Sequence, residues 1–168
     1  MNDDELERLV RINNLAESYD GPTDIRSIST LCDSQDADER VLGVILIQKQ
    51  PYTKEWFDLA RTMVSDSDNT CRWQSLIAIG LGVEIQPEWV WEVILDFGDT
   101  EDEDMQAAIG CVLLEELLAF DFETYFPKLK AVTLNAAPHW FSTAMYCTVA
   151  VPVDHKVEYQ AFLDSAEG

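Results

Sequence analysis

Three carboxylates spaced four residues apart form the pattern in this chain with the clearest chemical potential: Glu88, Glu92 and Asp96. On a helix this spacing places successive members about 40° apart on one face, and Glu84 extends the same register. Like charges at i and i+4 destabilise a helix by a few tenths of a kcal/mol per pair. A helix that accepts this repulsion either presents an acidic face to a basic partner or carries charge for solubility. Both interpretations stay open from the sequence.

Two tryptophans are candidate anchors for such a partner. Trp91 and Leu95 flank the carboxylates, whereas the apolar side of the same predicted helix carries Trp89, Val90, Val93, Ile94 and Phe97. An exposed tryptophan among acids suits docking on a basic protein, because the ring supplies contact area and the carboxylates supply steering. The alternative is that Trp91 and Leu95 pack against a neighbouring helix layer. Trp56, on another predicted helix, is the second candidate anchor.

An acidic turn follows this helix. Residues 99–104 hold five acids in six positions, directly before a further predicted helix. The helix dipole favours negative charge at that place, which accounts for one or two of them. The surplus is either a solvated turn or part of the same docking surface. In the second case Asp99, Asp102 and Glu103 are the residues expected to contact the partner.

The charge of the whole chain limits the choice of partner. The 55 residues between Arg72 and Lys128 contain thirteen carboxylates and no Lys, Arg or His. The net charge is −21, of which −6, −10 and −5 fall on residues 1–50, 51–104 and 105–168. A field of this sign repels phosphate backbones and anionic lipids and attracts basic proteins. We therefore expect a basic protein partner and neither direct nucleic-acid binding nor membrane binding.

Catalytic and metal chemistry are not favoured by the motifs. The acidic turns lack the Gly and Glu that a calcium-binding loop needs at its sixth and twelfth positions. His139 and His155 have no Cys or second His at zinc spacing. Glu115 and Glu116 lie on an apolar helix and are best explained as a solvent-facing ridge. Without a nucleophile elbow or a phosphate-binding glycine loop, we predict no catalytic residue, no metal and no cofactor.

The cysteines and the first residues of the chain indicate the cellular compartment in which we expect the protein. Cys32, Cys71, Cys111 and Cys147 are widely spaced within apolar patterns, which favours reduced buried thiols over two disulfides. Residues 1–5 are acidic where a secretory signal is basic, and no apolar run approaches the roughly 20 residues of a membrane span. The expectation is a cytoplasmic protein.

The elements that would position these residues are helices. The apolar period is close to 3.6 nearly everywhere, which predicts an all-α protein. The predicted helices cover residues 3–19, 24–31, 37–50, 53–63, 72–83, 88–97, 105–120, 121–132 and 138–148, with a last helix or strand at 152–163. Thr23 or Asp24 is expected to cap the second helix, and Thr53 the fourth. The first helix is expected to turn one apolar side inward, formed by Leu6, Leu9, Val10, Ile12 and Leu15.

An internal repeat of 32 residues links equivalent positions of successive helices. The residues that share this offset are Gly43, Ser75 and Ala107, Asp36 and Asp68, and Arg40 and Arg72. Small residues at one point allow paired helices to approach closely, and an Asp before a helix caps it.

Residues 68–80 carry an Asp, an Arg, a small residue and a terminal Gly in the positions typical of the HEAT and HEAT-like family, which this segment resembles. The resemblance covers residues 36–132 best, although Asp104 or Met105 replaces the arginine in the third repeat. It implies a right-handed α-α superhelix of about four to five helix pairs. This would be a single domain over 1–168, with an N-terminal cap (1–33), the clearest repeats (34–132) and a C-terminal cap (133–168). The second helices would line a concave surface near Trp56, Glu88 and Glu92.

Two functions follow as hypotheses. The first is a non-catalytic module whose acidic face docks on a basic protein, for instance a bacterial immunity or inhibitor protein that covers the active site of a cationic toxin such as a nuclease. The alternative is a structural or assembly scaffold in a cytosolic complex, with acidity serving solubility. HEAT-like DNA glycosylases share the fold type, but they resemble basic, DNA-gripping solenoids, and this chain has no basic run on its middle helices.

Overall fold

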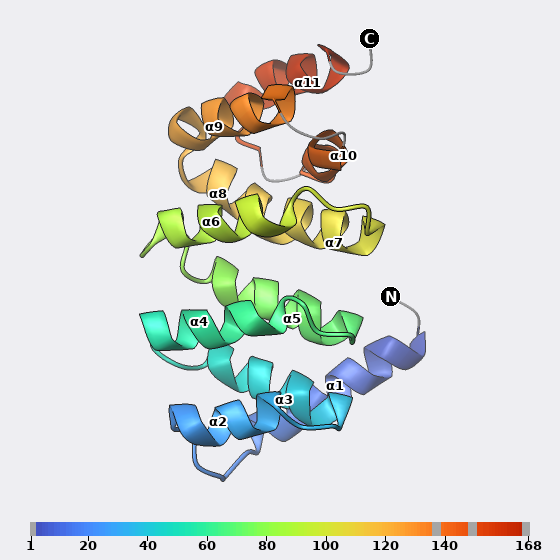
Figure 1. The fold of residues 1–168 in the computed structure, drawn as a ribbon, viewed down its shortest axis with the longest axis vertical. Coiled ribbons are helices and arrows are strands. Elements are labelled where there is room, and N and C mark those ends of the chain that lie inside the picture. Colours follow the sequence, from blue (N-terminus) through green and yellow to red (C-terminus); the bar gives the residue numbers. More distant parts are fainter. Residues whose placement is uncertain (1–2, 136–138, 148–150, 166–168) are drawn as a thin grey trace. The chain divides into compact units, whose positions relative to one another are not determined.

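The computed structural model describes residues 3–135, 139–147 and 151–165, and within these ranges it contains helices and no strands (Figure 1). The helices are α1 (Asp3–Glu17), α2 (Ile25–Cys32), α3 (Ala37–Gln48), α4 (Lys54–Met63), α5 (Asn69–Gly80), α6 (Pro87–Phe97), α7 (Glu103–Ala108), the π-helix η1 (Ile109–Leu114), α8 (Glu115–Phe120), α9 (Phe122–Asn135), α10 (His139–Met145), the 3-10 helix η2 (Val153–His155) and α11 (Lys156–Ser165). The all-α prediction is confirmed, and the segment predicted as a last helix or strand is helical. No helix in the described ranges combines the length and the apolar character that crossing a bilayer requires.

Contacts divide the chain into two compact units. Unit 1 is Met1–Leu81 and unit 2 is Gly82–Gly168. In unit 1, α3 packs against α1, α2, α4 and α5. In unit 2, the π-helix η1 packs against α6 and α10, and α8 packs against α6 and α9. Each unit therefore has a buried central helix segment surrounded by others.

Helix starts in both units are fixed by aspartate side chains. Asp24 accepts from the N–H groups of Arg26 and Ser27, both at 3.1 Å, so the cap of α2 is Asp24 and not Thr23. The residues that cap α3, α5 and α7 in the same way are Asp36, Asp68 and Asp102. Thr53 occupies the corresponding place before α4, but its side chain makes no capping hydrogen bond, so that part of the prediction is wrong.

The small residues of the 32-residue repeat lie where helices pack closely. A Cβ added to Gly43 on α3 would lie 2.9 Å from Sγ of Cys32 and 3.1 Å from the backbone N of Cys32. Only a residue without a side chain therefore lets α2 approach α3 this far. Ser75 on α5 is fully buried, and its hydroxyl donates to the carbonyl of Cys71 at 2.7 Å. Ala107, the third member, is half-buried.

The first helix does not bury the side that the apolar pattern indicated. Ile12 and Ala16 are buried, whereas Leu6, Val10 and Leu15 are exposed by 48%, 51% and 48%. The expected inward side is therefore wrong for these three residues. The physical reason is that α1 packs mainly on α3, and this contact covers one narrow strip of the helix.

The segment predicted as one helix over 105–120 is a continuous helical rod from Glu103 to Phe120, with the π-helix η1 in its middle. Gly110 lies in this π-helix, and an added Cβ would lie 2.5 Å from the carbonyl oxygen of Thr143 and 2.6 Å from Cβ of Tyr146. The backbone at Gly110 therefore touches α10 and the turn after it directly. On the rod, Leu113, Leu114, Leu117 and Leu118 are buried, and they form much of the core of unit 2.

Candidate protein-docking site

The predicted acidic stripe lies on the exposed side of α6. Pro87 opens this helix, and its buried side carries Val90, Trp91, Val93 and Ile94. On the other side the three carboxylates spaced by four are all exposed: Glu88, Glu92 and Asp96. Glu84, in the turn before α6, is exposed as well. The helix thus separates apolar from acidic residues largely as the sequence predicted.

Trp91 does not have the exposed position that an anchor for a partner would need. Its side chain is 7% exposed, and its ring centre lies 5.9 Å from that of Tyr125 on α9. The expectation of an exposed Trp91 is wrong, and the alternative, packing against a neighbouring helix, is correct for Trp91 but not for Leu95. Leu95, which was paired with Trp91 in that alternative, is exposed by 41%. The indole supports the acidic face from beneath and does not form part of its surface.

One carboxylate of the stripe is already bound to residues of α9. Glu88 Oε1 accepts a hydrogen bond from the Tyr125 hydroxyl at 2.9 Å, and Lys128 Nζ lies 2.9 Å from Oε1 and 3.1 Å from Oε2. The hydrogen bonds from Lys128 and then Tyr125 lower the pKa of Glu88. Burial, followed by the hydrogen bond to Glu88, raises the pKa of Tyr125 to about 12. Glu88 is therefore an ionised, partly neutralised member of the stripe.

The ammonium of Lys128 also faces two aromatic rings. Nζ lies 4.5 Å from the ring centre of Tyr125 and 6.0 Å from that of Trp91, both within the range of cation–π attraction. We refer to Glu88, Trp91, Tyr125 and Lys128 as the Glu88 cluster. The sequence interpretation missed Tyr125 and Lys128. The available signal was that Lys128 is the first cation after the 55 cation-free residues.

The acidic turn after α6 is ordered by its own polar groups. Asp102 Oδ1 accepts from the N–H of Asp104 at 3.0 Å and of Met105 at 3.3 Å, and thereby caps α7. The side-chain amide of Gln106 donates to the carbonyl of Thr100 at 2.6 Å. Asp102 is exposed but has this structural role. Asp99 and Glu103 are exposed carboxylates that could meet a partner.

The second predicted anchor, Trp56, lies in unit 1 on α4 and is half-buried. The surface described above is built from residues of unit 2 alone. In unit 1, by contrast, Asp38, Asp66 and Asp68 are bound by arginines.

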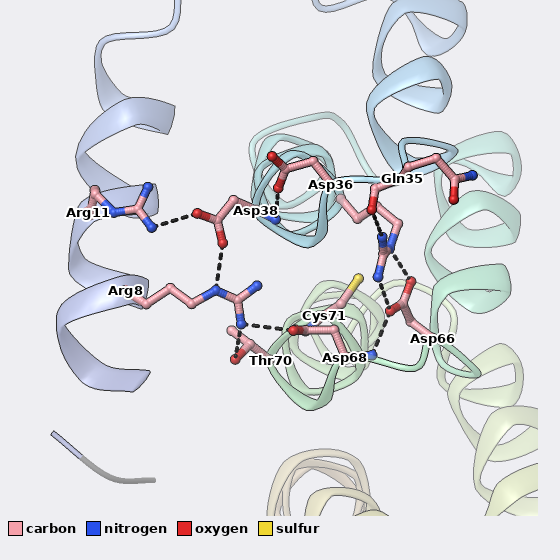
Figure 2. Close-up of polar contacts among 10 residues, drawn as sticks. Arg8, Arg11, Gln35, Asp36, Asp38, Asp66, Asp68, Thr70 and Cys71 are labelled. Atoms are coloured by element: carbon pink, nitrogen blue, oxygen red, sulfur yellow. Dashed lines mark hydrogen bonds and ion pairs between the residues drawn. The ribbon is translucent and has the colours of Figure 1, made fainter. Parts of the chain in front are cut away.

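Figure 2 shows the polar contacts at the starts of α3 and α5 in unit 1. Arg8 on α1 binds two acids, with Nε 2.6 Å from Asp38 Oδ1 and Nη1 2.8 Å from Asp68 Oδ2. Arg11 reaches the second oxygen of Asp38 at 2.6 Å. The hydrogen bond from Arg8 is the main cause that lowers the pKa of Asp38. Two arginines of α1 thus hold this helix to the helix starts beneath it.

A further arginine, Arg40, binds Asp66, which Figure 2 labels in the turn before α5. Arg40 Nε lies 2.7 Å from Asp66 Oδ2 and Nη2 lies 3.0 Å from Asp66 Oδ1, while Nη1 donates to the carbonyl of Ser34 at 3.1 Å. Burial alone would raise the pKa of Asp66, but hydrogen bonds from Arg40 and from the N–H of Asp68 outweigh it and lower this pKa. Asp38, Asp66 and Asp68 are therefore bound to arginines within the unit.

The two units differ in how far their acids are compensated. Residues 1–81 contain fifteen acids and eight Lys or Arg, a net charge of −7, whereas residues 82–168 contain seventeen acids and three Lys, a net charge of −14. Within the described part of unit 2, no ion pair reaches Glu84, Glu92, Asp99 or Glu103. The uncompensated negative charge is concentrated on unit 2.

The histidines of unit 2 lie beside single carboxylates. His139 Nε2 is 3.8 Å from Glu101 Oε1, and His155 Nε2 is 3.6 Å from Glu123 Oε1 while its ring stacks on Phe122 at 4.1 Å between centres. Among the residues that the structure describes, no group of three or more His, Cys, Asp or Glu side chains is placed to hold a metal ion.

The site that emerges is an acidic face on α6 and the turn after it, backed by buried aromatic rings of α6 and α9. No protein-family model matches this chain, and comparisons with curated proteins and with solved structures give no match either.

Proposed function

We propose that this chain is a non-catalytic binding module whose acidic surface docks on a basic protein. The observation that carries the proposal is the charge imbalance within unit 2, where four exposed carboxylates have no ion pair in the described part of that unit: Glu84, Glu92, Asp99 and Glu103. The residues proposed to meet the partner are Glu84, Glu92, Asp96, Asp99 and Glu103, with Glu88 as a partly neutralised member.

An acidic face of this kind acts mainly on partner choice and on the rate of association. A concentrated negative field attracts a basic surface over several ångströms and disfavours acidic competitors. The attraction weakens as salt shortens the screening length. Affinity itself needs contact area as well, and Leu95, exposed beside the carboxylates, is the apolar residue on α6 that could supply some of it.

A cationic toxin is the partner class that fits best. Clefts that bind nucleic acid are basic, so a small acidic protein can cover them by mimicking the charge of the natural substrate. We therefore propose an immunity or inhibitor protein of the cytoplasm that neutralises such a toxin, for instance a nuclease.

The same proposal includes a HEAT-like arrangement of helix pairs in a right-handed superhelix. It is supported by the 32-residue repeat, in which Asp36 and Asp68 cap α3 and α5 and in which Gly43 and Ser75 are both buried. On this view α6 is the second helix of its pair, and its outward residues face the partner.

A matched pair of triple variants tests the docking surface. E84K/E92K/E103K and E7K/D20K/E55K each raise the net charge by six, and all six positions are exposed. Binding to a cationic ribonuclease, measured by titration calorimetry at two salt concentrations, should weaken about tenfold or more in the first variant, since several charge contacts of roughly 0.5–1 kcal/mol are reversed. It should weaken far less in the second. Equal losses in both variants would mean that total charge decides binding and that unit 2 has no special surface.

A second function, the structural or assembly scaffold, is favoured by one feature of unit 1. Leu6, Val10 and Leu15 leave an apolar face of α1 exposed. If that face mediates assembly, the protein should form a stable oligomer in analytical ultracentrifugation, and L6S/V10S should dissociate it. A monomer at all concentrations that still binds basic proteins would reject the scaffold in its self-assembling form.

A further inference from the structure

The Glu88 cluster has the composition of a receptor for an ammonium group. One carboxylate and the faces of two aromatic rings surround Lys128 Nζ, with Glu88 oxygens at 2.9 and 3.1 Å and ring centres at 4.5 and 6.0 Å. Proteins recognise lysine and other ammonium groups with this combination of charge and π-faces. In the structure, the ammonium group of Lys128 occupies this cluster.

The receptor groups are also held by contacts that do not involve the lysine. Tyr125 and Trp91 are buried, their rings pack against each other, and the Tyr125 hydroxyl donates to Glu88 Oε1 at 2.9 Å. The hydrogen bond from Tyr125 to Glu88 therefore remains if Lys128 leaves. A site that needs no rearrangement costs little to refill with another ammonium.

The bound lysine, in contrast, is easy to displace. The side chains of Glu88 and Lys128 are 62% and 36% exposed, so the ion pair lies at the surface. Exposed ion pairs contribute little to stability, and a lysine on a flexible four-carbon stem can swing into solvent without breaking the core. The same site is thus accessible to an ammonium that arrives from outside.

We propose that Glu88, Tyr125 and Trp91 bind a lysine side chain of the basic partner, and that Lys128 occupies this place in the free protein. The inference rests on the proposed docking function and specifies its chemistry: the partner inserts an ammonium group next to the stripe of Glu92 and Asp96. Lys128 then acts as an internal competitor, which lowers the apparent affinity by the fraction of time that it fills the site.

Lys130 supplies a matched control on the same helix. Its Nζ lies 4.3 Å from the ring centre of Phe126 and 3.4 Å from Glu158 Oε1, so it also pairs one ring with one carboxylate. Lys128→Met and Lys130→Met remove the same charge, but the first alone vacates the Glu88 cluster. The probe is an octalysine peptide, and its binding to the full chain is measured by calorimetry at low salt, with circular dichroism and urea midpoints to confirm folding.

We expect K128M to bind octalysine about fivefold more tightly than K130M, because an exposed ion pair of typical strength no longer competes. Adding Glu88→Gln to K128M should remove this gain. Equal affinities of K128M and K130M would overturn the lysine site while leaving the acidic docking surface intact. Failure of every variant and of the wild type to bind octalysine would overturn the docking function itself. If K128M does not fold, Lys128→Gln carries the same comparison against Lys130→Gln.

Discussion

Arg40 holds Asp66 through both carboxylate oxygens, with Nε to Oδ2 at 2.7 Å and Nη2 to Oδ1 at 3.0 Å. The two side chains are 15% and 9% exposed, so the pair is largely shielded from water. Asp66 Oδ1 also accepts the N–H of Asp68 at 2.8 Å. One carboxylate therefore links α3 to the turn that starts α5.

Removing the arginine should destabilise unit 1 strongly. Arg40→Met keeps much of the side-chain volume but leaves Asp66 as a mostly buried charge without its cation. Loss of one partner from a buried pair costs on the order of 3 kcal/mol in the free energy of unfolding. Urea denaturation followed by circular dichroism measures this change. Lys54→Met, which breaks the exposed pair with Asp58, is the control and should change the value by no more than about 0.5 kcal/mol. Similar losses in both variants would contradict the structural role of Arg40.

The pH dependence of stability should carry the signature of Asp66. Its pKa is lowered in the folded protein, so its stabilising effect is complete above the ordinary carboxyl pKa of about 3.9 and is lost as the pH falls through the lower folded value. Asp66→Asn should therefore be less stable than the wild type at pH 7 and at pH 5, and the difference should shrink below about pH 4. Taking the difference between the two proteins cancels the general relief of charge repulsion near the pI. A difference that stays constant down to pH 3 would contradict the lowered pKa.

Much of the fold could be predicted because its signals are local. Helix caps depend on one side chain and the next two or three N–H groups, and Asp24, Asp36 and Asp68 cap their helices. The division of α6 into an apolar and an acidic side follows from a helical period of 3.6. The π-helix around Gly110, whose backbone lies against α10, was not predicted, because the apolar pattern of residues 105–120 indicates one regular α-helix.

The candidate site could be predicted only in part for the same reason. The sequence interpretation identified the exposed carboxylates of α6, since their exposure follows from the helix period. Whether Trp91 is covered depends on Tyr125, which lies on α9. The partner of Glu88 is likewise set by α9 and is forty residues away in the chain. Contacts between separate helices have no periodic signature in one sequence.

The cysteines should differ sharply in reactivity. Cys32, Cys71 and Cys147 are buried, and burial raises the pKa of Cys32 and of Cys147 to about 12. Cys111 is exposed, although partial burial also raises its pKa. Because the thiolate is the reactive form and needs access to reagent, Cys111 alone should react with Ellman's reagent in the native protein at pH 8, whereas all four should react in denaturant. Cys111→Ser should abolish the native reaction. Rapid reaction of more than one thiol would show that a buried cysteine is accessible.

The packing of α2 on α3 decides whether Gly43→Ala raises or lowers the free energy of unfolding. Helix propensity favours alanine at this position, whereas the close contact with α2 disfavours it. At an open helix position, Gly→Ala stabilises by up to about 1 kcal/mol through helix propensity. Here the added Cβ would lie 2.9 Å from Cys32 Sγ and 3.1 Å from both the Cys32 backbone N and Leu31 Cβ. Overpacking of this kind costs about 1–3 kcal/mol, so Gly43→Ala should lower the free energy of unfolding despite the better propensity. The control is Ala107→Gly at the equivalent, half-buried repeat position, which should cost about 0.5–1 kcal/mol from propensity alone. An increase in stability for Gly43→Ala, measured by urea denaturation, would mean that α2 can move away from α3 at little cost and that the close approach is not required.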